Sequence, residues 1–536
     1  MPSFWAHLAG PRLYGIFGHP NREESTLENL GNTVISFSAG IYYVASSLAF
    51  GPVILCYLYS RDWLTPAGMM SLLRSLAFGP VILCYLYSRD WLTPAGMMSL
   101  LRYAGYLTIL GFGARTIGRF FDETNARFLD VWENQEDKKQ SPSELKNYDF
   151  ELLKVVPDFQ ATPNPNLWHL EPELQETGVL TKGLAYWAVH AFGRHLIYPG
   201  SMALLKYMMR SNLNQARKLL VQNKNGRRVW IKTAEGDVID AMFLPGRQEL
   251  SQNLIICFEG NAGFYEIGVM NSPAQLGHTN LIICFEGNAG FYEIGVMNSP
   301  AQLGHTTLGF NIPGFGESSG LPYAKNTLSS ADAVMQYAMK VLGYRQENIV
   351  LFGWSIGGFP VAWLAANYPN VKAVVLDATF DDLLPLAQFR MPGAISFIVE
   401  CAIRMHMNLQ IDKIIARYKG PLRLIRRLQE EILTTAVDDQ PESVRRATNR
   451  INWLLKAVIK QRHPELIKGL EPQVDRWLDM NPTERLMHSG VTLREESQQR
   501  KRLFDACTHY LVDFDATHVT PLDPLFFNIP EGRDNF

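Results

Sequence analysis

The sequence predicts an α/β fold: a mainly parallel β-sheet with helices on both faces, preceded by an apolar, helical N-terminal region. From Arg227 onward, short apolar runs rich in β-forming residues alternate with helix-length segments, as is typical of parallel sheets. One run leads through GWSIG, residues 353–357, directly into a helical segment. A long uncharged stretch, residues 34–60, indicates that the N-terminal region differs from the rest.

The composition excludes several classes of protein. Hydrophobic residues make up 47% of the 536 residues, which is too apolar for a disordered chain. The 50 Lys and Arg residues are balanced by 52 Asp and Glu residues, so no basic excess indicates nucleic-acid binding. The six cysteines form no C-x-x-C pair or regular spacing. We therefore expect neither a metal site nor a nucleic-acid partner.

Two segments of the chain occur twice without a change. Residues 47–74 recur as 75–102, and residues 253–279 recur as 280–306. Two copies are too few for a repeat array, in which neighbouring units stack to bury a shared core. We interpret both as duplications, genuine or introduced by gene assembly, within an ordinary fold.

Residues 1–120 are predicted to anchor the protein in a membrane. The run at 34–60 exceeds the roughly 20 residues that cross a bilayer core, although a buried core helix is the alternative. A second span is expected near 98–113, with Arg102 at its interface. The first duplication adds a shorter apolar run at 75–87. Because basic residues flank the anchor on both sides, we expect an even number of spans, hence a multi-pass membrane protein.

Residues 121–225 are expected to form a helical linker region. Its apolar helical stretches contain Trp, Tyr and Met residues that fit either core packing or contact with lipid. Beyond it, residues 227–245 resemble a β-hairpin around Glu235-Gly236-Asp237. The remaining predicted strands are LIICFEG, TLGFNIPG, NIVLFGWS, VKAVVLDA, PLRLIRR and HYLVDFDATH.

The motif at 353–357 is G-x-S-x-G in the strand–turn–helix context of a nucleophile elbow. Ser355 would stand at a sharp turn, where residues two positions away must lack bulk. The amide of Ile356, at the start of the following helix, could stabilise an oxyanion. A chance match in a tight turn is the alternative. The motif predicts the α/β-hydrolase fold for residues 226–536.

A serine nucleophile needs a base, and in this fold the acid and then the histidine follow it in the chain. His518 comes just after the last predicted strand, where the base belongs, whereas a purely structural histidine is the alternative. The acid should follow the strand at 420–427. Glu430 is our first choice there and Glu431 the second. The competing carboxylates follow the preceding strand: Asp377, Asp381 and Asp382.

The second oxyanion donor usually comes from the loop after the third strand. That loop reads EGNAG and exists twice, so its asparagine is Asn261 or Asn288. We favour the second copy, because it runs directly into the next strand. Two further segments are expected as insertions. Residues 383–412 form a lid-like insertion that shapes an acyl pocket or packs in the core, and residues 436–500 form a helical insertion.

The whole chain resembles the α/β-hydrolase domain-containing protein 16 family of membrane-bound phosphatidylserine lipases. The resemblance rests on EGNAGFYE, NIPGF, GWSIGGF, LDATFDDL, YKGPLRLIRR and DATHVTPL. It implies a lipase that converts phosphatidylserine to lysophosphatidylserine, with some monoacylglycerol lipase activity, in the endoplasmic reticulum membrane. It places the nucleophile on Ser355, the base on His518 and the acid on Glu430, where the family pattern has aspartate. The duplications depart from that pattern.

We therefore expect a serine lipase that acts by two-step acyl transfer without a cofactor. A lipid acyltransferase is one alternative, because His518 and Asp523 match an H-x-x-x-x-D spacing. A membrane scaffold that is catalytically impaired by the duplicated oxyanion strand is the other.

Overall fold

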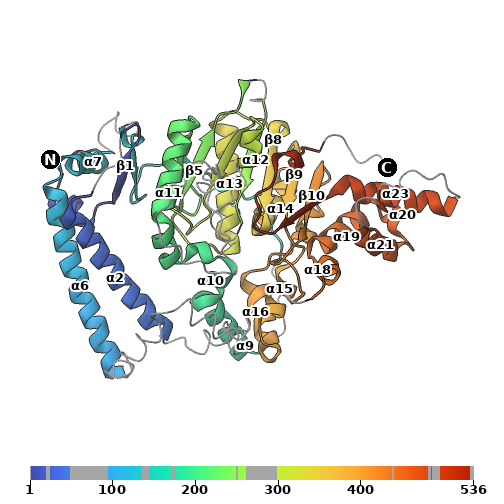
Figure 1. The fold of residues 1–536 in the computed structure, drawn as a ribbon, viewed down its shortest axis with the longest axis horizontal. Helices are drawn as coiled ribbons and strands as arrows, with labels where there is room; N and C mark the ends of the chain where they lie inside the picture. Colours follow the sequence, from blue (N-terminus) through green and yellow to red (C-terminus); the bar gives the residue numbers. More distant parts are fainter. Residues whose placement is uncertain are drawn as a thin grey trace.

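A computed structural model describes residues 2–19, 24–48, 94–135, 144–171, 177–248, 252–260, 298–437, 440–480, 484–485 and 495–530. In these residues a nine-stranded sheet runs in the order β11-β10-β9-β8-β6-β7-β5-β4-β3 (Figure 1). Its strands are β3 (Phe159–Gln160), β4 (Arg227–Lys232), β5 (Val238–Leu244), β6 (Leu254–Phe258), β7 (Thr306–Phe310), β8 (Ile349–Trp354), β9 (Ala373–Asp377), β10 (Leu422–Gln429) and β11 (Leu511–Thr517).

The sheet is mainly parallel, as the sequence predicted. Strands β4 and β5 pair antiparallel across the turn at Gly236, whose φ of 104° suits a residue without a side chain. Strand β5 also pairs antiparallel with β7. The other neighbouring strands run parallel. The expected hairpin and the α/β class are therefore both present.

Alternate residues of the central strands belong to different cores. On β6, Leu254, Ile256 and Phe258 pack in one hydrophobic cluster, whereas Ile255 and Cys257 pack in another. Strand side chains point alternately to the two faces of a sheet, so both faces are covered. This explains why the strands read as continuous apolar runs in the sequence.

The helices of the catalytic region lie between the strands along the chain. They are α11 (Ala203–Asn223), α12 (Asn298–Gln302), α13 (Ala324–Lys340), α14 (Gly358–Asn367), α15 (Leu383–Arg390), α16 (Ser396–His406), α17 (Ile411–Ile415), α18 (Glu442–Thr448), α19 (Ile451–Arg462), α20 (Pro464–Ile467), α21 (Glu471–Asp479) and α23 (Glu495–Tyr510). Helices α15 to α17 lie between β9 and β10, and α18 to α23 lie between β10 and β11.

Both copies of the second duplicated segment contribute elements to the fold. The first copy supplies strand β6, which pairs with β7 and β8. The second copy supplies helix α12 and leads directly into β7. Our preference for the second copy of the strand is therefore wrong. The first copy follows the β4–β5 hairpin after a short connection, so it reaches the sheet first, and residues 261–297 lie outside the described residues.

The N-terminal region forms a helical hairpin and a small two-stranded sheet. Its elements are α1 (Phe4–Ala9), β1 (Leu13–Ile16), α2 (Thr26–Leu48), α6 (Pro94–Phe120), α7 (Glu123–Glu133) and β2 (Tyr148–Phe150). Helices α2 and α6 lie side by side (Figure 1). Their backbones approach closely, since a Cβ atom on Gly118 would lie 2.3 Å from the Glu28 nitrogen.

The multi-pass membrane localisation that we predicted is contradicted. None of the helices in the part of the chain that the structure describes combines the length and the apolar character that a bilayer crossing requires. Helix α2 carries Glu28 in its first turn, and α6 carries Arg119 in its last turn. Arg119 pairs with Glu28 at 3.1 Å, with both side chains fully buried, so a buried ion pair joins the two helices. The apolar run at 75–87 lies outside the described residues.

Residues 121–225 contain more than helices. Besides α7 and α11, they include α9 (Val179–Ala188) and α10 (Arg194–Ile197), but also strands β2 and β3. Strand β3 joins the edge of the main sheet parallel to β4. Strand β2 pairs antiparallel with β1. This region therefore connects the N-terminal hairpin to the sheet through strand pairing.

Candidate active site

Ser355 stands at the sharp turn between β8 and α14. Its φ is +56°, a left-handed conformation that is uncommon for a residue with a side chain. The two flanking glycines are needed for space. A Cβ atom on Gly353 would lie 2.7 Å from the Gly357 carbonyl oxygen, and one on Gly357 would lie 2.5 Å from the Phe258 carbonyl oxygen. The geometry is that of a nucleophile elbow, as the motif predicted.

The turn is also held from strand β9. Thr379, two residues beyond the end of β9, donates a hydrogen bond from its hydroxyl to the Ser355 carbonyl at 2.7 Å. A Cβ atom on Gly358 would lie 2.2 Å from the same hydroxyl oxygen, so the helix start packs directly on Thr379. These contacts on both sides of the turn stabilise the strained backbone conformation of Ser355.

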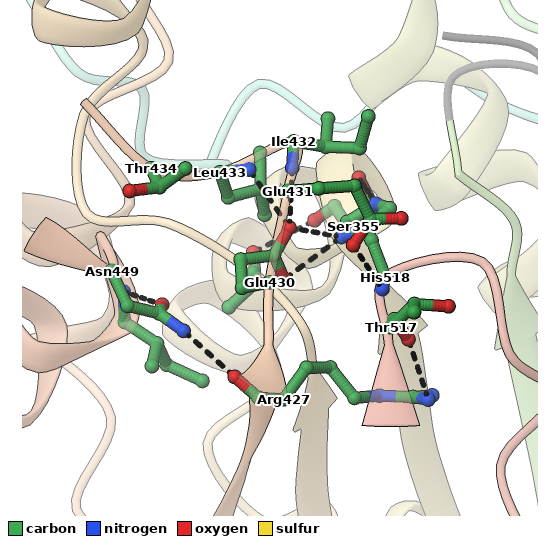
Figure 2. Close-up of polar contacts among 12 residues, drawn as sticks. Ser355, Arg427, Glu430, Glu431, Ile432, Leu433, Thr434, Asn449, Thr517 and His518 are labelled. Atoms are coloured by element: carbon green, nitrogen blue, oxygen red, sulfur yellow. Dashed lines mark hydrogen bonds and ion pairs between the residues drawn. The ribbon is translucent and has the colours of Figure 1, made fainter. Parts of the chain in front are cut away.

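His518 lies immediately after β11 and reaches both other predicted residues. Its Nε2 atom is 3.1 Å from the Ser355 Oγ atom. Its Nδ1 atom is 3.0 Å from Oε2 and 2.9 Å from Oε1 of Glu430. All three side chains are buried, with at most 2% of each residue exposed. Figure 2 shows the three in one continuous chain of contacts, although they come from distant parts of the sequence.

Glu430 is held in position by its own backbone neighbours. Its Oε1 atom accepts hydrogen bonds from the backbone N–H groups of Ile432 at 2.9 Å and Leu433 at 2.8 Å. Burial alone would raise the pKa of the carboxyl. His518 and the two backbone donors outweigh burial, so the pKa of Glu430 is lowered from its usual value. The carboxylate is thus ionised at neutral pH and faces the imidazole ring.

Glu431 contacts the same histidine at a different atom. Its Oε2 atom accepts a hydrogen bond from the backbone N–H of His518 at 2.8 Å. Burial raises the pKa of this carboxyl. Of the two adjacent glutamates, Glu430 is therefore the one that contacts the imidazole ring of His518, and Glu431 binds the backbone of His518.

The three competing aspartates bind arginines. Asp377 accepts two hydrogen bonds from Arg427, at 2.9 and 2.6 Å. Asp382 caps helix α15 and pairs with Arg404. Asp381 pairs in the same two-pronged way with Arg450. Each carboxylate thus has a charged partner that explains its position.

Part of the predicted oxyanion hole falls within the described residues. Ile356 is buried and directly follows Ser355 in the turn that leads into α14. Asn261 and Asn288 both lie outside the described residues. The loop that leads to Asn261 starts beside the nucleophile, because a Cβ atom on Gly260 would lie 2.3 Å from the Trp354 ring.

His518 and Asp523, the two residues of the acyltransferase spacing, contact different partners. The Asp523 carboxylate accepts a hydrogen bond from the Leu525 backbone N–H at 2.9 Å and caps a short 3-10 helix. His518 meanwhile contacts Ser355 and Glu430. The H-x-x-x-x-D match is thus explained by a local turn.

Sequence reasoning missed Arg427, which lies three residues before Glu430. It is 1% exposed, and its Nη1 atom donates to the carbonyl oxygens of Thr517 at 3.3 Å and Thr520 at 2.7 Å. A signal was present, because a charged residue in a buried strand requires a buried partner. The adjacent Arg426 and Arg427 in strand β10 could have directed attention to this position.

Comparison with known families agrees with the fold and the motifs. The profile of the phosphatidylserine lipase ABHD16 N-terminal domain matches residues 2–79 and again residues 74–151. Each match contains one full copy of the first duplication. The alpha/beta hydrolase fold profile matches residues 280–516.

Full-length relatives decide the family. An uncharacterized protein of Caenorhabditis elegans, F37A4.1, is 73% identical and is covered over 100% of both chains. Phosphatidylserine lipase ABHD16A of Macaca fascicularis is 32% identical over 80% of this chain and 82% of its own length. The chain belongs to the ABHD16 family. Among solved structures, an α/β hydrolase of Vibrio vulnificus matches 53% of this chain and 82% of its own, with 15% identity and a TM-score of 0.33.

Membership in the ABHD16 family confirms the resemblance that the motifs indicated. Together with the α/β-hydrolase fold, it makes this chain a serine hydrolase of the lipase type. In the structure, His518 contacts Ser355, and Glu430 contacts His518.

Proposed function

We propose that this ABHD16-family enzyme removes an acyl chain from phosphatidylserine to give lysophosphatidylserine, using Ser355, His518 and Glu430 as its catalytic triad. Monoacylglycerol is a second proposed substrate. One observation carries the proposal: the unbroken contacts from Ser355 Oγ to His518 Nε2 and from His518 Nδ1 to Glu430. The head group is inferred from the related lipases, which are named for phosphatidylserine.

In the proposed first step, His518 accepts the proton of Ser355 while the serine oxygen attacks the ester carbonyl. The imidazolium that forms is stabilised by the ionised carboxylate of Glu430, which stays ionised itself. His518 then returns the proton to the departing alcohol. The lysolipid leaves, and the acyl chain remains esterified to Ser355.

The second step reverses these roles with water. His518 takes a proton from a water molecule, which attacks the acyl carbon. The imidazolium then gives that proton to the Ser355 oxygen as its bond to the acyl carbon breaks, so the fatty acid is released and the serine hydroxyl is restored. In both steps the amide of Ile356 donates to the oxyanion, with Asn261 or Asn288 as the proposed second donor. Loss of one such donor typically slows a reaction of this kind on the order of 100-fold to 1000-fold.

Helices α15 and α16, within the predicted insertion 383–412, are proposed to shape the acyl pocket. Helix α16 packs on α9, with the Tyr186 and His406 ring centroids 5.7 Å apart. Large apolar side chains remain exposed on these helices: Val179, Leu180, Trp187, Phe389 and Phe397. Apolar surface of this kind suits the binding of hydrocarbon chains.

The proposal is tested by supplying phosphatidylserine, phosphatidylcholine and monoacylglycerol to the purified full chain. We expect free fatty acid and lysophosphatidylserine to form from phosphatidylserine, with slower release from phosphatidylcholine. Ser355→Ala should reduce release to the uncatalysed background. Equal turnover of both phospholipids would contradict the head-group assignment, and turnover by the Ser355→Ala variant would contradict the triad.

A further inference from the structure

The turn that carries His518 is attached at two points that lie outside the triad. The Glu431 carboxylate accepts the His518 backbone N–H at 2.8 Å. The Arg427 guanidinium donates to the carbonyl oxygens of Thr517 and Thr520, one on each side of His518. Figure 2 shows Arg427 reaching the Thr517 carbonyl and Glu431 beside His518.

Both attachments come from strand β10 or its end, which also supplies Glu430. Arg427 is fixed by Asp377 on β9, and each of these two side chains is 1% exposed. The backbone carbonyl of Glu431 lies 3.4 Å from the Arg390 Nη2 atom, which donates to it. The triad acid Glu430 and the two residues that bind the backbone around His518, Arg427 and Glu431, therefore belong to one short segment of the chain.

Regular strand pairing cannot hold the turn by itself. The parallel register between β10 and β11 shifts between Arg427 and Gln429. Strand β11 ends at Thr517, so His518 has no place in the ladder. An irregularity of this kind disrupts the local hydrogen-bond ladder, as a β-bulge does, so other groups must fix the backbone there.

We infer that Glu431 is a positioning residue, which holds the backbone of His518 so that its Nε2 atom reaches Ser355. The Glu430 contact orients the imidazole ring, but a ring can keep that contact while its backbone moves. Catalysis depends on placement, because a displacement of about 1 Å can cost on the order of 100-fold in rate. This inference rests on the proposed function of Ser355 and His518.

A matched pair of substitutions separates the hydrogen bond from the charge. Glu431→Gln keeps a side-chain oxygen that can accept the His518 N–H, whereas Glu431→Met has similar length and no such acceptor. Both remove the negative charge. Glu442→Ala, at an exposed pair with Arg446 on α18, is the control for loss of a carboxylate.

The measurements are kcat and KM for phosphatidylserine and the rate of Ser355 labelling by a fluorophosphonate, all on the full chain. We expect Glu431→Met to lower kcat and the labelling rate about tenfold or more while KM changes less than about twofold. Glu431→Gln should stay within about threefold of the wild type in both, because it restores the hydrogen bond. Glu442→Ala should match the wild type.

The inference fails if Glu431→Met labels and turns over like the wild type, or if Glu431→Gln is as slow as Glu431→Met. The second result would assign the effect to charge instead of position. Glu431→Ala also lacks an acceptor and serves the same comparison if the methionine variant does not fold. If the wild type itself is not labelled, the proposed triad fails, which is distinct from failure of the positioning role.

Discussion

Two adjacent glutamates act on one histidine through different atoms. Glu430 contacts the imidazole ring, and Glu431 contacts the backbone N–H of the same residue. A one-residue change of register after β10 would take Glu430 away from the ring. The positions therefore depend on the backbone donors of Ile432 and Leu433, which hold the Glu430 carboxylate in place.

The lowered pKa of Glu430 predicts how stability depends on pH. Its carboxyl is easier to ionise in the folded chain than at the usual value of 4.5, despite the opposing effect of burial. The unfolded chain therefore binds the proton more readily, so this group stabilises the fold above about pH 4.5. That contribution is lost as the pH falls from 4.5 through the folded pKa.

Urea unfolding of the wild type and of Glu430→Gln between pH 3 and 7 measures this effect. We expect the wild type to lose more unfolding free energy than the variant as the pH falls below about 4.5. Equal pH dependence in the two proteins would show that Glu430 does not carry the effect. His518→Ala should likewise weaken it, because the imidazole is one of the causes that lower the Glu430 pKa.

At this scale the sequence predicted the residues with a distinctive context. Ser355 stood in a specific motif, His518 followed the last strand, and Glu430 followed the strand before it. The sequence could not exclude Asp377 or Asp382, because their arginine partners are 50 and 22 residues away. Without those pairs in view, each remained a candidate acid.

Among the secondary-structure elements, the duplicated strand gave the clearest departure from expectation. The first copy supplies strand β6, and the second copy supplies helix α12. Both copies have the same sequence, so no local preference can distinguish them. The choice depends on chain connectivity: the first copy is near the hairpin and the second is next to β7.

Deletion of residues 261–287 would leave one strand, one EGNAG loop and one helix. We expect the shortened protein to keep the same sheet and to be about 1 kcal/mol more stable, because a shorter connection costs less closure entropy. Urea unfolding measures the stability, and fluorophosphonate labelling reports on the site. A shortened protein that unfolds or loses labelling would show that the second copy is required.

For the whole molecule, the N-terminal region and the catalytic sheet share a buried polar network. Asp149 on β2 accepts from Arg217 on α11 at 2.6 Å and from Arg228 on β4 at 3.0 Å. Arg228 also pairs with Asp240 on β5. Tyr14 on β1 donates to Glu317 in the loop after β7.

These contacts could not be predicted from the sequence, because they join residues that lie far apart in the chain. The apolar runs near the N-terminus indicated a membrane anchor, but helix α6 carries Arg119 into a buried position, where it pairs with Glu28 of α2. Composition within one window does not reveal a partner 91 residues away. The catalytic motifs, by contrast, are defined by neighbouring residues and strand ends, which the sequence shows directly.

The central claim is that Ser355 is the nucleophile activated by His518 and Glu430, and covalent labelling tests it most directly. The full chain is treated with a fluorophosphonate, digested, and analysed by mass spectrometry to locate the modified residue. We predict modification at Ser355, abolished in Ser355→Ala and slowed at least about 100-fold in His518→Ala. Absence of labelling in folded protein, labelling at another residue, or an unchanged rate in His518→Ala would contradict the account.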